Sequence, residues 1–185
     1  LKKYPRKRTQ GIVMSFKGKI LQDLPSFTKS KNNECLLGID NLEDPQNLGQ
    51  IIRTAECAKI SGILLPKHQS VQLTDSVLQV SQGAFVHLPI YYCGNLNQQL
   101  QILKKEGFWI IGVENNIKAI SWHQLDYKRK LVLVMGSEGK GLRSVIMKTC
   151  DEIITIPMQG NLNSLNVSSA TSIILFERMR QLSHS

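Results

Sequence analysis

Two groups of polar residues have the types and the spacing that chemistry on a ribose or a phosphate requires. In the first group, the loop amide Asn47 and the glycine Gly49 precede Arg53, which lies in a helical pattern. Asn47 and Arg53 lie less than two helical turns apart, so both could converge on one anion or ribose. The start of a helix also attracts phosphate. Alone the group is weak evidence, because an arginine near a helix start is usually only solvated.

The second group is Glu138, Ser164 and Asn166, which lie in two polar loops that each follow an apolar run. The first loop, 136–141, contains three glycines. Taken singly, the serine and the asparagine fit helix caps and the glutamate fits a loop charge. Their joint position after two buried strands instead favours a ligand site at the carboxyl edge of a parallel sheet.

Other chemistries fit the chain poorly. The loop 136–141 has the order G-x-x-G-x-G, which matches neither the dinucleotide fingerprint nor the phosphate loop. There is no G-x-S-x-G sequence for a nucleophile elbow. The four histidines and four cysteines share no metal-ligand spacing, so we predict no metal.

The elements that must position these residues alternate between strand and helix. Apolar runs predict strands at 35–39, 63–65, 88–91, 108–113, 131–135 and 153–156. Helical spacing predicts helices at 49–59, 73–84, 96–107, 143–149 and 165–182, with a short one near 120–125. We expect a loop over 40–48, because Pro45 would block a helix there. The alternation predicts an α/β fold, with a mostly parallel sheet covered by helices on both faces.

Composition and charge indicate a globular chain with a basic arm. Of 185 residues, 42% are hydrophobic, and no apolar run approaches the length of a membrane span. Residues 1–31 carry nine Lys and Arg against one acidic residue, whereas the rest carries 14 basic against 13 acidic residues. A basic arm on a near-neutral body favours a nucleic-acid partner. A solvated tail and the remnant of a mitochondrial presequence are the alternatives.

Three motifs in order resemble those of the SpoU (TrmH) family of RNA 2'-O-ribose methyltransferases. The first is DPQNLG with Arg53, Thr54 and Ala55, and the second is VMGSEGKG at 134–141. The third comprises IPM at 156–158 and SLNVS with Ala170. The closest resemblance within the family is to 23S rRNA guanosine-2'-O-methyltransferases. Lys59 departs from the pattern, because relatives usually have glycine there.

The resemblance implies the SPOUT fold with a C-terminal trefoil knot, S-adenosylmethionine as the cofactor, and a homodimer with a shared active site. It implies cofactor contacts and a catalytic cluster from separate parts of the chain. The cofactor contacts would be Gly136, Ile156, Met158 and Leu165. The catalytic residues would be Asn47, Arg53, Glu138, Ser164 and Asn166.

We therefore predict methylation of a ribose 2'-hydroxyl in RNA, with a guanosine of 23S-type rRNA as the target. The alternatives are a tRNA 2'-O-methyltransferase and a non-catalytic, RNA-binding ribosome-assembly factor. We expect residues 1–33 to be an arm that follows a missing RNA-binding domain, and 34–185 to be the methyltransferase domain. We expect a cytoplasmic or, alternatively, a mitochondrial location. The identity of the general base stays open, between Glu138 and an unusually desolvated Arg53.

Overall fold

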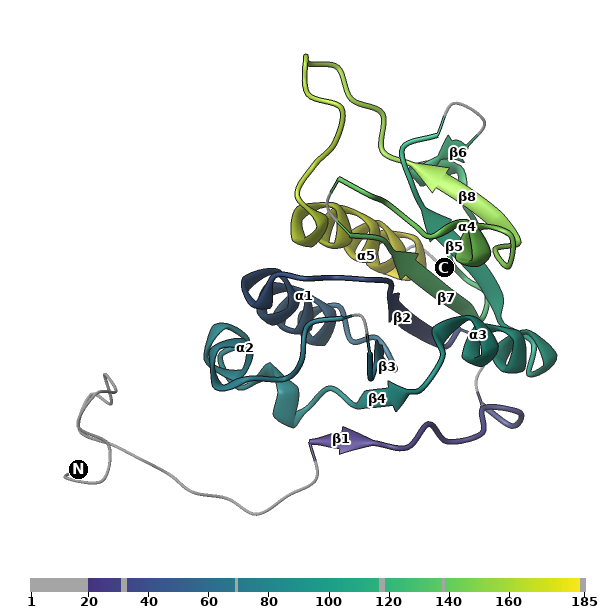
Figure 1. Ribbon diagram of the computed structural model, residues 1–185. Helices are drawn as coiled ribbons and strands as arrows, with labels where there is room; N and C mark the ends of the chain where they lie inside the picture. Colours follow the sequence, from purple (N-terminus) through teal and green to yellow (C-terminus); the bar gives the residue numbers. More distant parts are fainter. Residues whose placement is uncertain (1–19, 31–32, 69, 117–118, 138, 184–185) are drawn as a thin grey trace.

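The structure is a computed structural model that describes residues 20–30, 33–68, 70–116, 119–137 and 139–183. These residues form one sheet of eight strands with helices on both faces (Figure 1). The strands are β1 Leu21–Gln22, β2 Cys35–Ile39, β3 Gly62–Pro66, β4 Ile90–Cys93, β5 Trp109–Val113, β6 Ile120–Ser121, β7 Leu131–Met135 and β8 Glu152–Thr155. The helices are α1 Pro45–Cys57, α2 Asp75–Val80, α3 Leu96–Lys105, α4 Ser144–Met147 and α5 Val167–Ser183, with 3-10 turns η1 Ala84–Val86 and η2 Trp122–Gln124.

The order of the strands is β1-β4-β3-β2-β7-β5-β8-β6, and all seven pairings between these strands are parallel. β2, β3 and β4 follow one another outward, with β1 at that edge of the sheet. The chain then crosses to the other side to form β5 and β6, inserts β7 between β2 and β5, and finally inserts β8 between β5 and β6. In an open parallel sheet, the place where the strand order reverses is where ligands bind, beyond the carboxyl ends of the strands. The predicted mostly parallel α/β fold is confirmed.

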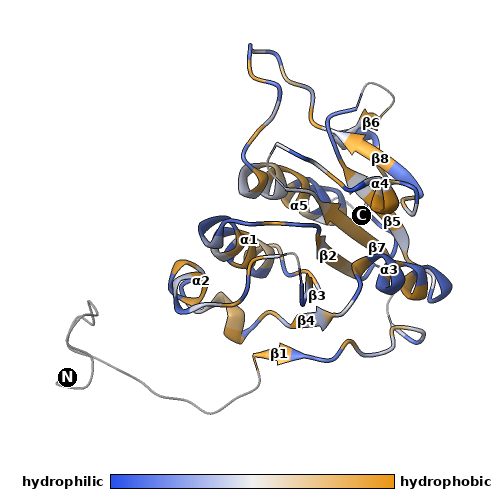
Figure 2. Cartoon of the chain, viewed as in Figure 1, coloured by the Kyte–Doolittle hydropathy of each residue, from blue (hydrophilic) through white to orange (hydrophobic). Residues whose placement is uncertain are grey.

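The core divides into two layers because alternate residues of each strand point to opposite faces. On β7, Leu131, Leu133 and Met135 pack with α1, α2 and α5, whereas Val132 and Val134 pack with α3 and α4. Figure 1 shows these two groups of helices on opposite sides of the strands, and Figure 2 shows that the central strands are hydrophobic. Both faces are therefore buried, which explains why the strands are continuous apolar runs.

The predicted loop over 40–48 is wrong in its second half, because α1 already begins at Pro45. Proline is compatible with a first helical turn, where its missing N–H has no partner in any case. Asp44 caps the helix by accepting from the N–H of Gln46 at 2.8 Å. The early start places Asn47 on the helix itself, where it is 3% exposed.

Other predicted helices differ from the structure in length or in kind. The second ends at Val80, because Gln82 and Gly83 take φ values of +50° and +89° and a 3-10 turn follows. The segment near 120–125 is not a helix but a two-residue strand and a 3-10 turn. In contrast, the third helix starts where expected, because the side chain of Asn95 caps α3 by accepting from Gln98 N.

The described end of the predicted arm packs against the sheet. β1 pairs with β4, and the buried Phe27 ring meets Tyr91 and Phe108 edge to face at centroid distances of 6.4 and 5.5 Å. The division of the chain at residue 33 stays a prediction. None of the described helices is both long and apolar enough to cross a membrane.

Candidate active site

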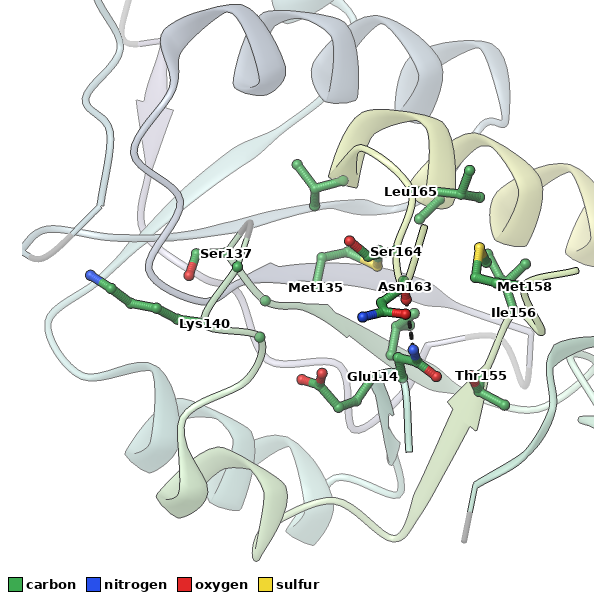
Figure 3. A pocket seen from close by; sticks show the side chains of 17 residues that line it. Glu114, Met135, Ser137, Lys140, Thr155, Ile156, Met158, Asn163, Ser164 and Leu165 are labelled. Carbon is green, nitrogen blue, oxygen red and sulfur yellow. Dashed lines mark hydrogen bonds between the residues drawn. The ribbon is translucent and has the colours of Figure 1, made fainter. Parts of the chain in front are cut away.

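A pocket with a cavity volume of about 310 Å³ lies at the carboxyl ends of β5, β7 and β8, beside the start of α5 (Figure 3). This volume is at the lower end of the range of about 300–1,000 Å³ that small-molecule sites occupy. Part of the lining is apolar: Met135, Ile156, Met158, Leu165, Val167 and Ala170. Another part carries polar side chains: Glu114, Asn115, Ser137, Thr155, Asn163 and Ser164. A heterocycle fits the first part, and a ribose or an amino-acid group fits the second.

The loop after β7 is folded so tightly that two of its glycines cannot be replaced without displacement. A Cβ on Gly136 would lie 2.3 Å from the carbonyl carbon of Gly141, across the turn that Gly141 N closes on Ser137 O at 2.9 Å. Gly141 has a φ of +63°, and its Cβ would lie 2.2 Å from Glu114 Oε2. The glycines therefore serve the shape of this loop, which forms one wall of the pocket.

Two carboxylates hold the far end of this loop from the strands on either side of β7. Glu114, which follows β5, accepts a hydrogen bond from Leu142 N at 2.6 Å. Asp40, which follows β2 and is fully buried, accepts from Arg143 N at 2.9 Å and from Arg143 Nε at 2.7 Å. Charge-assisted hydrogen bonds of this kind are stronger than neutral ones, so the loop is fixed relative to the sheet.

The loop after β8 reaches the other side of the pocket and brings two distant sequence motifs together. The side-chain oxygen of Asn166 accepts from Ser168 N at 2.9 Å and thus caps α5. Its amide nitrogen Nδ2 donates to Asn47 Oδ1 on α1 at 2.9 Å. Asn115 Nδ2 also donates to Asn163 O at 2.6 Å, which ties the loop to the end of β5 (Figure 3).

The structure places most of the predicted site residues in or beside this pocket. The predicted cofactor contacts all line it: Gly136, Ile156, Met158 and Leu165. Ser164 lines it as well, and Asn47 and Asn166 are bonded to each other. The roles of these residues stay predictions.

Arg53 and Glu138 are the exceptions. Arg53 is exposed on α1 and lines a separate hollow with Glu56 and His87 instead of the pocket in its own chain. Glu138 lies outside the described residues.

Sequence reasoning missed the polar residues that β5 contributes, Glu114 and Asn115. The signal was present, since two polar residues directly follow the predicted strand 108–113. Their importance depends on β5 lying next to β7 and β8, which the sequence pattern does not reveal.

Two buried hydroxyls indicate that the lining suits a polar ligand. Ser137 Oγ and Thr155 Oγ1 have no hydrogen-bond partner among the residues described. Buried hydroxyls nearly always have one, so a ligand with hydroxyl or amine groups would complement this lining. The described residues contain no group of His, Cys, Asp and Glu that could hold a metal ion. The adenine of S-adenosylmethionine therefore fits the apolar part of the lining, and its ribose and amino-acid groups fit the polar part.

Together the fold and the site define a parallel α/β protein with a nucleoside-sized pocket at the switch point of its sheet. The family model described as SpoU rRNA Methylase family matches residues 34–176. The 23S rRNA (guanosine-2'-O-)-methyltransferase RlmB of Shewanella oneidensis is 41% identical over 175 residues, which cover 93% of this chain and 71% of that protein. The chain therefore belongs to the SpoU rRNA methylase family.

Solved structures agree with this assignment. An AdoMet-bound rRNA methyltransferase from Sinorhizobium meliloti has a TM-score of 0.76 at 30% identity and covers 82% of this chain and 58% of that one. The SpoU methyltransferase AviRb from Streptomyces viridochromogenes, in complex with AdoMet, has a TM-score of 0.80. At 21% identity, covering 88% of this chain and 66% of that one, AviRb supports the fold alone.

The family membership confirms several predictions. The predicted resemblance is confirmed, and with it the enzyme class, an RNA methyltransferase that uses S-adenosylmethionine. The SPOUT-type arrangement of the sheet and helices is confirmed as well. The trefoil knot stays a prediction.

Proposed function

We propose that this chain methylates the 2'-hydroxyl of a ribose in RNA, and that its target is a guanosine of large-subunit rRNA. The activity in the name of the Shewanella relative, which is 41% identical, supports this target. The basic character of residues 1–31 is consistent with an RNA partner. S-adenosylmethionine, when bound, supplies a methyl group that is bonded to a positively charged sulfur. The sulfur is a good leaving group when the methyl group is displaced from it.

The Asn47–Asn166 hydrogen bond is the observation that carries the proposal. It joins two motifs that are 119 residues apart and places their amides beside the pocket lining at Leu165 and Val167. Both amides are held in place, one by the first turns of α1 and the other by its capping bond to α5. We infer that they orient the target ribose, since positioning of the hydroxyl is the main task in an in-line displacement.

Arg53 requires a partner subunit under this proposal. It lies outside the pocket of its own chain, so a second copy must bring its own Arg53 to that pocket. α5, which packs on α1, leaves Phe176 48% exposed and Met179 37% exposed. We propose that this apolar surface takes part in a homodimer interface.

The proposed role of Arg53 is to bind the phosphate beside the target ribose. A guanidinium matches phosphate with paired hydrogen bonds, but it keeps its proton and is a poor general base. The base therefore stays open, and Glu138 is the candidate that the loop sequence offers.

A direct assay tests the reaction. The protein is incubated with radiolabelled S-adenosylmethionine and either a 23S rRNA transcript or a tRNA transcript, and the methylated nucleotide is mapped. Label at a 2'-oxygen of a guanosine in the rRNA supports the proposal, whereas label in the tRNA alone supports the tRNA alternative. Cofactor binding with no labelled RNA, while RNA still binds, would point to an assembly factor.

Complementation between variants tests the shared site. An Arg53→Ala chain and an Asn166→Ala chain are each assayed alone and then after mixing under conditions that exchange subunits. If Arg53 acts on the pocket of its partner, a mixed dimer contains one intact site and regains activity. If Arg53 acts within its own chain, mixing restores nothing. Sedimentation of the wild-type protein as a monomer at assay concentration would also contradict the dimer.

A further inference from the structure

Glu114 has one carboxylate oxygen committed to the protein and one that is not. Oε2 accepts from Leu142 N at 2.6 Å and holds the loop after β7. Among the described residues, nothing donates to Oε1 or forms an ion pair with this carboxylate. The side chain is partly buried and lines the pocket, and Figure 3 shows it extending along the side of the pocket that the glycine loop forms.

The charge of Glu114 is not balanced by the other charged residue of the described lining. That residue is Lys140, whose ammonium pairs with Glu43 at 3.5 Å, with both side chains about three-quarters exposed. A partly buried carboxylate that keeps an unused acceptor is costly unless a donor reaches it. The pocket is the space from which such a donor can come.

The shape of the loop also keeps this carboxylate in place. A Cβ on Gly141 would lie 2.2 Å from Oε2 and 2.6 Å from Oε1, so only glycine leaves room for both oxygens. The neighbouring Asn115 is bonded to Asn163 O across the pocket, which limits movement of the chain after β5. Glu114 is thus a fixed acceptor and not a mobile surface charge.

We propose that Glu114 binds the cofactor directly, with Oε1 accepting a hydrogen bond from a ribose hydroxyl or from the α-ammonium group of S-adenosylmethionine. The proposal rests on the cofactor assignment made above. One carboxylate then links the ligand to the backbone of the glycine loop. Cofactor binding would accordingly stabilise this loop and prepare the pocket wall for the RNA.

The test uses Glu114→Gln, measured by calorimetric titration of the full chain. The glutamine oxygen still accepts from Leu142 N, but its NH₂ group replaces the free acceptor with a donor. We expect S-adenosylmethionine to bind about 10- to 100-fold more weakly, as for the loss of a hydrogen bond to a charged group. The unfolding temperature without ligand should stay close to that of the wild type.

Two further ligands identify the group that donates. Methylthioadenosine has the ribose but lacks the amino-acid portion, whereas S-adenosylhomocysteine has both but lacks the sulfonium charge. Equal weakening of all three ligands assigns the contact to the ribose. Weakening of the two amino-acid-containing ligands alone assigns it to the ammonium group. Both results support the proposal.

Glu106→Gln is the matched control. Glu106 also accepts a backbone hydrogen bond, from Phe27 N at 2.7 Å. It precedes β5, however, and so lies at the amino end of this strand, whereas the pocket lies at the carboxyl end. This variant should bind all three ligands as the wild type does.

Two results would overturn the proposal. One is a Glu114→Gln variant that binds every ligand like the wild type. The other is a Glu114→Gln variant that, without ligand, loses as much stability as Glu114→Ala does. Glu114 would then only hold the loop after β7 and would have no role in binding. If the wild-type protein itself fails to bind S-adenosylmethionine, the cofactor assignment fails first and the proposal fails with it.

Discussion

Replacing Gly141 by alanine should damage the pocket wall far more than the same replacement at Gly139, although both glycines lie in one loop. Both have positive φ values, +63° for Gly141 and +79° for Gly139. A Cβ on Gly139 would meet no atom within 4 Å, whereas a Cβ on Gly141 would overlap the carboxylate of Glu114. The pair therefore separates backbone strain from the displacement of one side chain.

The expected magnitudes follow from these contacts. Left-handed backbone strain costs an alanine about 1–2 kcal/mol, which is the whole expected loss for Gly139→Ala. Gly141→Ala must also move Glu114 away from Leu142 N, and a lost hydrogen bond to a charged group adds about 1.5–3 kcal/mol. For a chain of this size, 1 kcal/mol lowers the unfolding temperature by about 2–4 °C. We expect a fall of about 2–8 °C for Gly139→Ala and of about 5–20 °C for Gly141→Ala.

Differential scanning calorimetry on the two variants provides the measurement, with cofactor titration as a second readout. In a Glu114→Ala background, Gly141→Ala should cost only the backbone strain, because the overlapping carboxylate is gone. Equal losses for the two glycine variants, or no relief in the double variant, would refute the reasoning about this loop.

Three further variants test other parts of the structure. Asn47→Ala should lower kcat about 10- to 100-fold and leave the dissociation constant of the cofactor unchanged in titration, because Asn47 does not line the pocket; an unchanged kcat would contradict its proposed role. Lys59→Gly should raise the free energy of unfolding by about 1 kcal/mol in thermal melts, because Lys59 has a φ of +50° after α1. A hydrogen bond from Arg180 lowers the pKa of Glu177 to about 2, so Arg180→Met should be less stable than the wild type at pH 7. This difference should disappear as the pH falls from about 4.5 to 2 in acid titrations, since the stabilisation by a depressed carboxyl pKa is lost over that range.

The central strands could be predicted to the residue. Cys35–Ile39 and Leu131–Met135 have the same bounds in sequence and structure. Both are uninterrupted apolar runs, because helices cover both faces of the sheet there. Helix ends were less predictable. Pro45 predicts a loop where α1 begins, but a proline in the first turn is compatible with a helix.

The motifs of the candidate site could also be predicted from the sequence, but not which of them lie close together in the folded chain. The family resemblance predicts four cofactor contacts, and all of them line the pocket: Gly136, Ile156, Met158 and Leu165. Glu114 was missed, because a glutamate after a strand is normally a solvated charge. Its importance arises only where the ends of β5 and β7 meet.

The sequence by itself determined which segments are buried, where the polar loops follow them, and which family the motifs resemble, because these properties depend on neighbouring residues. Tertiary structure decided the rest. It placed β7 between β2 and β5, so that Asp40 and Glu114 hold one loop from both sides. It also joined Asn47 to Asn166. The physical reason is that sheet order and these hydrogen bonds depend on packing between residues far apart in the chain, which local patterns do not encode.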